Sequence, residues 1–198
     1  MMNQININYY KLKYFKYKLK YTLYKQNMFK DKNNTQLYSF NGVWAYSNGS
    51  EDKCKSDELN YNNGYFTGIK WQCVEYARRY IQSVFGVTFS QVESAYEIPN
   101  AIFTRLEDNK IIETSIYNEN CISNKLDSLT NSLIIWPKDY ESDALHGHVA
   151  IIVSVNKDDE SNISGLYVAE QNYDNNNNYY RFIPLSSIKN VTIISINN

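Results

Sequence analysis

One buried helix stands out in the pattern of apolar and polar positions. Apolar side chains recur at intervals of three and four residues between Cys73 and Phe85, which is the period of a helix with one buried face. Gly86 follows directly and is suited to end the helix, because glycine readily adopts the left-handed conformation found after helix C-termini. The pattern therefore predicts a helix over residues 73–85. The apolar positions are Val74, Ala77, Ile81, Val84 and Phe85.

Short runs rich in β-branched residues dominate the second half of the chain and predict strands. A further short strand is expected within residues 42–49, followed by a long polar surface loop that ends near Asn63. Residues 95–106 are interpreted as a second helix interrupted by Pro99. A helix in the front half followed by strands predicts an α+β fold with an antiparallel sheet. The four runs in the second half are 133–136, 149–155, 166–170 and 191–196.

Residues 1–36 differ from the rest of the chain because lysine and tyrosine alternate along them. The segment is basic and low in complexity, which is typical of a flexible extension, although cations beside aromatic rings also suit RNA or an anionic surface. It lacks glycine-framed RNA-binding motifs. We expect residues 1–36 to form a flexible extension and residues 37–198 to form one catalytic domain.

The overall composition narrows the classes of partner. The chain has 198 residues and is 43% hydrophobic, which is enough for one substantial core. Its net charge of −1 gives no overall field towards nucleic acid or anionic membranes. No apolar run approaches the roughly 18 residues that span a membrane, and the N-terminus has no apolar core of a secretion signal. We therefore expect a cytoplasmic protein with no nucleic-acid partner and no membrane insertion.

Cys73 is the candidate reactive residue among three cysteines, which are too few and too scattered for a disulfide framework. It falls where a loop becomes the predicted helix, whereas Cys54 and Cys121 have no such context and are interpreted as bystanders. A cysteine attacks as a thiolate, and its ordinary pKa of about 8.5 leaves little thiolate at neutral pH. The partial positive charge of the helix N-terminus and an imidazolium from His148 would both lower the pKa of Cys73. The alternative is a small side chain packed under Trp71.

A hairpin is predicted to bring His148 to a third residue. If residues 149–155 pair antiparallel with residues 166–172, residue numbers that face each other sum to about 318 to 321. Because side chains alternate along a strand, Glu170 and Asn172 share one face, and either could orient the imidazole. We favour Glu170, with Asn172 as the alternative.

Two further side chains near these residues have candidate roles. Gln72 could direct its amide towards the oxyanion of a tetrahedral intermediate, with the backbone N–H of Cys73 as the other donor. His146 and His148 together raise the alternative of a zinc site. No Cys-x-x-Cys or His-Glu-x-x-His motif accompanies them, so no metal is expected.

The charged residues of the predicted helix allow two interpretations. Glu75 and Arg79 are four residues apart in the favourable order, a pair worth about 0.3 to 0.5 kcal/mol if it is exposed. Arg78 lies outside that pairing, so its guanidinium could bind a substrate carboxylate in bidentate fashion.

Six motifs, in their order and approximate spacing, resemble those of a known enzyme group. The two most specific are the cysteine motif at 70–79 and Ala-Glu-Gln-Asn at 169–172. From about Gly42 to its C-terminus, the chain resembles the amidase domain of glutathionylspermidine amidase/synthetase and trypanothione synthetase, members of the CHAP group of papain-like amidohydrolases. The other four motifs are Gly42-Val43 with Ala45-Tyr46-Ser47, Phe85-Gly86-Val87, Leu133-Ile134-Ile135-Trp136 and Gly147-His148-Val149-Ala150-Ile151-Ile152.

The resemblance implies a fold and an activity. The fold would be α+β and papain-like, of the CHAP/NlpC-P60 type, with the nucleophile at the N-terminus of a buried helix packed on an antiparallel sheet. Cys73 would be the nucleophile, His148 the general base and acid, Glu170 the orienting residue and Arg78 a substrate contact. The family's amidase domain cleaves the amide between the glycine carboxyl of glutathione and an amine of spermidine. A glutathione–polyamine conjugate is therefore the expected substrate, and no cofactor is expected.

Other functions stay open at this point. The family's well-known members carry an ATP-dependent ligase domain after the amidase, so we expect this chain not to synthesise the conjugate, and a separate ligase is a candidate partner. Residues 107–132, 156–165 and 175–178 resemble low-complexity insertions, which leaves the pocket shape open. One alternative is a CHAP amidase or endopeptidase acting on another peptide, such as a cell-wall peptide. Another is a non-catalytic binding protein that uses the basic N-terminal arm.

Overall fold

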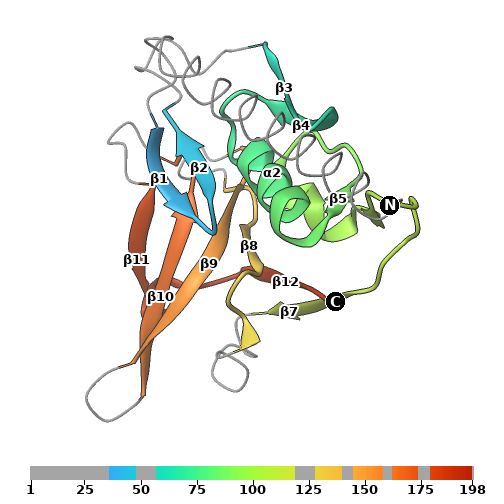
Figure 1. Ribbon diagram of the computed structural model, residues 1–198. Helices are drawn as coiled ribbons and strands as arrows, with labels where there is room; N and C mark the ends of the chain where they lie inside the picture. The colour runs from blue at the N-terminus through green and yellow to red at the C-terminus, as the bar shows by residue number, and fades with distance from the viewer. Residues whose placement is uncertain are drawn as a thin grey trace, which may run out of the picture. The chain divides into compact units, whose positions relative to one another are not determined.

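A six-stranded antiparallel sheet forms the centre of the described structure (Figure 1). The computed structural model describes residues 36–47, 57–118, 128–139, 145–157, 162–173 and 179–197. The strands lie in the order β11-β10-β9-β8-β12-β7, and each pairs antiparallel with its neighbours. They are β7 (Thr114–Asn118), β8 (Leu133–Trp136), β9 (His148–Lys157), β10 (Ile163–Glu170), β11 (Tyr180–Pro184) and β12 (Thr192–Ile196).

The helix α2 (Cys73–Phe85) packs against one face of this sheet (Figure 1). Its apolar side shares one hydrophobic core with Val149 and Ile151 of β9, which alternate along that strand. Gly86 ends the helix in the left-handed conformation, with φ of 65°, and its N–H donates to the carbonyl of Gln82. The helix therefore has the bounds and the C-terminal stop that its sequence predicts.

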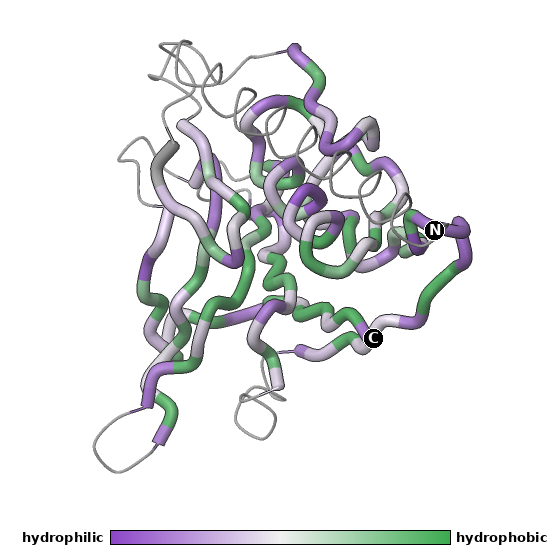
Figure 2. Tube along the Cα trace, viewed as in Figure 1, coloured by the Kyte–Doolittle hydropathy of each residue, from purple (hydrophilic) through white to green (hydrophobic). Residues whose placement is uncertain are grey.

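The opposite face of the sheet carries a second apolar cluster. Ala150 and Ile152 of β9 point into it together with Leu166 and Val168 of β10, and all four are fully buried. Figure 2 shows apolar residues concentrated along the central strands. The sheet is thus covered on both faces, and its strand ends are the places where polar groups can gather.

Three short hairpins and two 3₁₀ helices surround the sheet and the helix. Each hairpin is antiparallel. The hairpins are β1 (Gln36–Phe40) with β2 (Val43–Tyr46), β3 (Leu59–Asn62) with β4 (Tyr65–Ile69), and β5 (Val87–Phe89) with β6 (Phe103–Arg105); the 3₁₀ helices are η2 (Ala95–Asn100) and η5 (Leu185–Ser187).

The predicted strands at 42–49, 133–136, 149–155, 166–170 and 191–196 correspond to β2, β8, β9, β10 and β12. The second helix predicted over 95–106 is wrong, because only Ala95–Asn100 is helical, in 3₁₀ form, and Phe103–Arg105 is a strand. The predicted polar loop is partly wrong, because it contains β3.

Some predictions fall on residues outside the description. The proposed N-terminal extension lies there, apart from Gln36, and so do Cys54 and Cys121. Among the described helices, none is both long enough and apolar enough to cross a bilayer.

Candidate active site

Cys73 is the first residue of α2, directly after the N-cap residue Gln72. Its thiol is half-buried and in the reduced form. The sulfur forms a hydrogen bond with the side chain of His148, and the backbone N–H groups of Val74 and Val149 also donate hydrogen bonds to the sulfur. The helix start therefore places the sulfur against the first residues of β9.

The surroundings favour a charged pair of Cys73 and His148. Burial raises the pKa of the thiol, but the hydrogen bond and charge of His148 and the two backbone donors outweigh it, so the pKa lies below its ordinary value. Burial lowers the pKa of His148, yet the hydrogen bonds and charges of Cys73 and Glu170 raise it to about 9. Both shifts favour a thiolate beside an imidazolium.

The carboxylate of Glu170 is the third group. Its Oε2 lies 2.9 Å from Nε2 of His148, and the carboxylate is fully buried at the end of β10. The observed pairing of Glu170 with Ala150 makes the residue numbers sum to 320, within the predicted range. His148 lies two residues before Ala150 and therefore on the same face as Glu170, as strand alternation predicts.

Gly147 is required by the close approach of β8 to the start of β9. Its φ is 63°, and a Cβ added there would lie 2.5 Å from the backbone oxygen of Trp136. Any other residue would be strained and would push the Gly-His turn away from β8.

We expect Gly147→Ala to move His148 away from Cys73 and Glu170. The thiolate would lose its cationic partner, so alkylation of Cys73 by iodoacetamide at pH 6 should slow towards the rate of an ordinary thiol. Gly42→Ala is the matched control, since Gly42 also has a positive φ, of 78°, but meets nothing within 4 Å of an added Cβ. Equal loss of thiol reactivity in both variants would contradict this role of Gly147.

Gln72 and Asn172 contact each other. Nδ2 of Asn172 donates to Oε1 of Gln72 over 2.7 Å. The side chain of Asn172 is thus directed at Gln72, while Glu170 holds the imidazole of His148. The carbonyl oxygen of Gln72 is thus engaged by Asn172, and the role of Gln72 as an oxyanion donor stays a prediction.

The interpretation of Arg78 as a substrate contact is corrected by the structure. Its side chain is buried, and the guanidinium donates to three backbone carbonyls, those of Thr67, Phe89 and Ser90. It also lies 4.2 Å from the centre of the Phe89 ring. Burial lowers the pKa of Arg78 to about 10. Arg78 fastens α2 to β4 and β5 and is not available to a substrate carboxylate.

His146 lies apart from the His148 site. It precedes β9, and its Nδ1 is 2.9 Å from the hydroxyl oxygen of Ser94. The positive φ of Gly147 interrupts the alternation that would have turned both rings to one side. Within the described ranges, no three histidine, cysteine or acidic side chains come close enough together to hold a metal ion.

Three residues beside His148 were not singled out for the site by sequence reasoning. Arg181 of β11 pairs with Glu170 through Nε, and its Nη2 donates to Oε2 over 3.3 Å. The rings of Trp136 and Tyr173 lie 5.8 Å and 5.2 Å from the imidazole of His148, between centroids. A sequence signal for Arg181 exists only in the alternation of β11, which becomes informative once its pairing with β10 is known.

A pocket of about 490 Å³ opens beside His148. The imidazole and the rings of Trp136 and Tyr173 form part of its wall, and the charged side chains on it come from β11 and from the segments after β8 and η5. A cavity of this size accommodates a small ligand or part of a peptide. The charged lining residues are Lys138, Asp139, Arg181 and Lys189.

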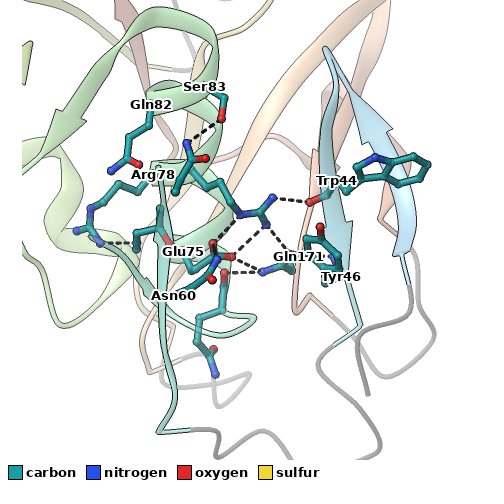
Figure 3. A network of polar contacts seen from close by, with 12 residues as sticks. Trp44, Tyr46, Asn60, Glu75, Arg78, Gln82, Ser83 and Gln171 are labelled. Carbon is teal, nitrogen blue, oxygen red and sulfur yellow. Dashed lines mark hydrogen bonds and ion pairs between the residues drawn. The ribbon is translucent and has the colours of Figure 1, made fainter. Parts of the chain in front are cut away.

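A second polar network lies behind the site, on the inner side of α2 (Figure 3). Gln171, the residue after Glu170, donates to the backbone oxygen of Gln72 and to Oε2 of Glu75. Glu75 is fully buried and forms a bidentate ion pair with Arg79. The helix pair predicted from the sequence therefore exists, but in the interior and joined to the strand end that carries Glu170.

The fold and the site together define a class of protein. A cysteine at the start of a helix, paired with a histidine at the start of a strand in an antiparallel sheet, is consistent with a papain-like α+β fold. A family model described as CHAP domain matches residues 60–172, more than half of the chain. The chain therefore belongs to the CHAP domain family, here with one described α-helix and a predominance of strands.

Two named relatives are similar over part of the chain. The bifunctional glutathionylspermidine synthetase/amidase of Escherichia coli (strain K12) is 33% identical over 115 residues, which cover 57% of this chain and 17% of that protein. The protein of the same name from Shigella flexneri gives the same values. The chain thus spans less than one fifth of the length of these relatives.

Proposed function

We propose that this protein is a cysteine amidase that cleaves C–N amide bonds through a thioester. The supporting observation is the continuous chain of hydrogen bonds from Cys73 through His148 to Glu170, with the sulfur at a helix N-terminus. Membership of the CHAP domain family and the similarity to two synthetase/amidase proteins also favour hydrolysis of an amide.

The chemistry follows from the charges of the resting site. The Cys73 thiolate attacks the amide carbonyl, and the resulting oxyanion meets the backbone N–H of Cys73, which has no partner within the helix, and the amide nitrogen of Gln72. The C–N bond then breaks as His148 gives its proton to the departing amine, leaving a thioester. His148 next removes a proton from water, the hydroxide attacks the thioester, and the acid leaves with restoration of thiolate and imidazolium. Glu170 holds the imidazole through both stages.

The pH dependence of thiol reactivity tests the ion pair without a substrate. Because the pKa of Cys73 is lowered and that of His148 is raised to about 9, thiolate should persist well below the pH at which an ordinary thiol is protonated. Alkylation by iodoacetamide, followed on the Cys73 peptide by mass spectrometry, should therefore stay fast from neutral pH into the mildly acidic range. His148→Ala should restore the ordinary thiol profile. An ordinary profile in the unchanged protein would exclude the resting ion pair.

One candidate substrate is a conjugate of glutathione with a polyamine, such as glutathionylspermidine. The names of the two similar proteins include amidase and glutathionylspermidine. The cysteine and Ala-Glu-Gln-Asn segments lie within residues 60–172, which match the CHAP domain model. On this proposal, the glycine carbonyl of glutathione is the site of attack and spermidine is the leaving amine.

A second candidate substrate class is favoured by the charges of the pocket. The leaving amine must reach His148 to receive its proton, so the rest of the leaving group extends into the pocket that borders His148. The described charged lining there has Lys138 and Lys189 against Asp139, with Arg181 engaged by Glu170. This excess of positive charge favours a leaving group with a carboxylate, as in a peptide, over a polycationic amine.

A matched pair of substrates separates the two candidates. Glutathionylspermidine and glutathionylglycine share the same acyl part and differ in the leaving amine, so the rates of their cleavage show which leaving amine the protein prefers. Release of glutathione by the protein but not by Cys73→Ala supports the amidase, and the ratio of the two rates identifies the substrate class. Lys189→Glu should shift that ratio towards spermidine if the pocket takes the leaving group. Cleavage of neither conjugate, nor of a cell-wall stem peptide, would contradict the proposed function.

A further inference from the structure

Three neighbouring strands each place one residue on the sheet face opposite α2, at the strand ends next to Cys73. Glu170 faces Ala150 across β9 and β10, and Arg181 faces Val168 across β10 and β11. Since side chains two residues apart share a face, His148, Glu170 and Arg181 lie on the same face of β9, β10 and β11. Figure 1 shows these three strands side by side. The arrangement puts the carboxylate between an imidazole and a guanidinium.

Arg181 contacts both carboxylate oxygens of Glu170, and His148 contacts one of them. Nε of Arg181 donates to Oε1, while Oε2 accepts from Nη2 of Arg181 at 3.3 Å and lies 2.9 Å from Nε2 of His148. The carboxylate is fully buried, so water cannot replace a lost partner. Two fixed donors from one side leave Oε2 in a single position relative to the imidazole.

Aromatic rings hold the guanidinium in place. The guanidinium carbon of Arg181 lies 3.7 Å from the centre of the Tyr173 ring and 5.8 Å from that of Trp136. The same two rings contact the imidazole of His148. Arg181 is therefore fixed from its face by stacking and from its edge by Glu170, and its side chain is 22% exposed.

We infer that Arg181 is a positioning residue of the active site, which balances the charge of Glu170 and fixes its orientation while His148 gains and loses its proton. The inference rests on the proposed role of His148 as general acid and base. When His148 is protonated, Glu170 has two cationic partners; when His148 has given its proton to the leaving amine, Arg181 alone balances the buried carboxylate. Without Arg181, the imidazolium would be held by an unopposed carboxylate and would release its proton less readily.

The titration of His148 gives a direct test, because the chain has only two histidines. Their imidazole signals can be followed by NMR against pH, and His146→Gln assigns them. Among the described residues, the charged and titratable groups around His148 are Cys73 from α2, Glu170 from β10, Arg181 from β11, Tyr173 after β10, Lys138 and Asp139 after β8, and Lys189 after η5.

Removing the positive charge of Arg181 and removing the negative charge of Glu170 should move the pKa of His148 in opposite directions. Arg181→Met removes a positive charge, so the pKa of His148 should rise by roughly one unit or more. Glu170→Gln removes the negative charge and leaves Arg181 nearby, so the pKa should fall. Arg181→Lys keeps the charge and should leave the pKa near that of the unchanged protein. In Glu170→Gln/Arg181→Met, both charges are absent and the pKa should lie between those of the single variants.

Catalysis provides the second measurement. When a conjugate that the protein cleaves is used as substrate, Arg181→Met should lower kcat more than it raises KM. The substrate still binds, but His148 transfers its proton to the leaving amine less readily. Arg181→Lys should recover part of kcat. An unchanged pKa of His148 in folded Arg181→Met would overturn the inference, whatever the substrate proves to be. If no conjugate is cleaved but the pKa moves as expected, the proposed function fails while the electrostatic role of Arg181 stands.

Discussion

Replacing Cys73 by alanine is expected to abolish amide hydrolysis while leaving the protein folded. The thiolate supplies the electron pair that forms the thioester, and no other group among the described residues occupies its position at the helix start. Removal of a catalytic nucleophile that works together with its base costs at least about 10⁴-fold in kcat. The change from thiol to methyl alters little volume at a half-buried position, so the melting temperature should change little.

The control variants separate chemistry from folding. Cys73→Ser keeps a hydroxyl in place of the thiol but is a weaker nucleophile, and it should also lose nearly all activity. Cys54→Ala and Cys121→Ala are the matched cysteine controls and should keep full activity. Release of amine is measured by mass spectrometry and the melting temperature by circular dichroism. Retained turnover with a large loss of stability in Cys73→Ala would mean that Cys73 is a packing residue.

The parts of the fold that the sequence predicts are those with a strong periodic apolar signal. The helix α2 has one buried apolar stripe, and the strands β8, β9 and β12 are rich in buried isoleucine, leucine and valine. The strands β3, β7 and β11 were missed because each has several exposed or half-buried residues and lies in a small hairpin or at a sheet edge. Their pairing comes from tertiary structure and not from a local pattern.

The placement of His148 and Glu170 could be predicted because it depends on one local hairpin. In an antiparallel pair, the numbers of facing residues have a constant sum. The irregularity between Tyr167 and Val168 changes this sum by only one. Arg181 could not be placed in this way, because its contact with Glu170 needs the register of a third strand. The role of Glu170 in catalysis stays a prediction.

The prediction for Arg78 failed for a geometric reason. Five residues along a helix correspond to a rotation of about 140° beyond a full turn, so Arg78 projects away from the side of Cys73. Its guanidinium therefore points towards β4 and β5, where Thr67 and Phe89 present carbonyl oxygens. Closeness in sequence to the candidate nucleophile was a poor guide to closeness in space.

The second large effect is expected for Arg79, whose change to methionine should destabilise the protein by about 3–5 kcal/mol. Glu75 is fully buried and accepts hydrogen bonds from Nε and Nη2 of Arg79 at 2.6 Å and 3.1 Å. Coulomb attraction and hydrogen bonding from Arg79 hold the pKa of Glu75 below its ordinary value, against burial, which raises it. Without Arg79 the carboxylate would be left buried beside the neutral donors Asn60 and Gln171.

Matched variants distinguish the loss of a buried ion pair from the loss of packing. Glu75→Leu/Arg79→Met removes both charges and should be less destabilised than Arg79→Met alone. Lys70→Met breaks the exposed ion pair with Glu58, in which the two side chains are 29% and 73% exposed, and should cost less than about 1 kcal/mol. The free energy of unfolding is measured by urea denaturation. A double variant as unstable as Arg79→Met would indicate that packing among the aromatic rings around Arg79 dominates.

The same variant should also weaken the site, because the network reaches the residue before Cys73. Arg79 donates to the carbonyl oxygen of Trp44 and to Oε1 of Gln171, whose Nε2 in turn donates to the backbone oxygen of Gln72 (Figure 3). Loss of Arg79 therefore loosens the contact between the start of α2 and the end of β10, and a small displacement there separates the thiol from its base. At a temperature where Arg79→Met is still folded, alkylation of Cys73 at mildly acidic pH should be slower than in the unchanged protein, whereas Lys70→Met should react at the normal rate. Normal thiol reactivity in folded Arg79→Met would show that the network stabilises the fold without positioning Cys73.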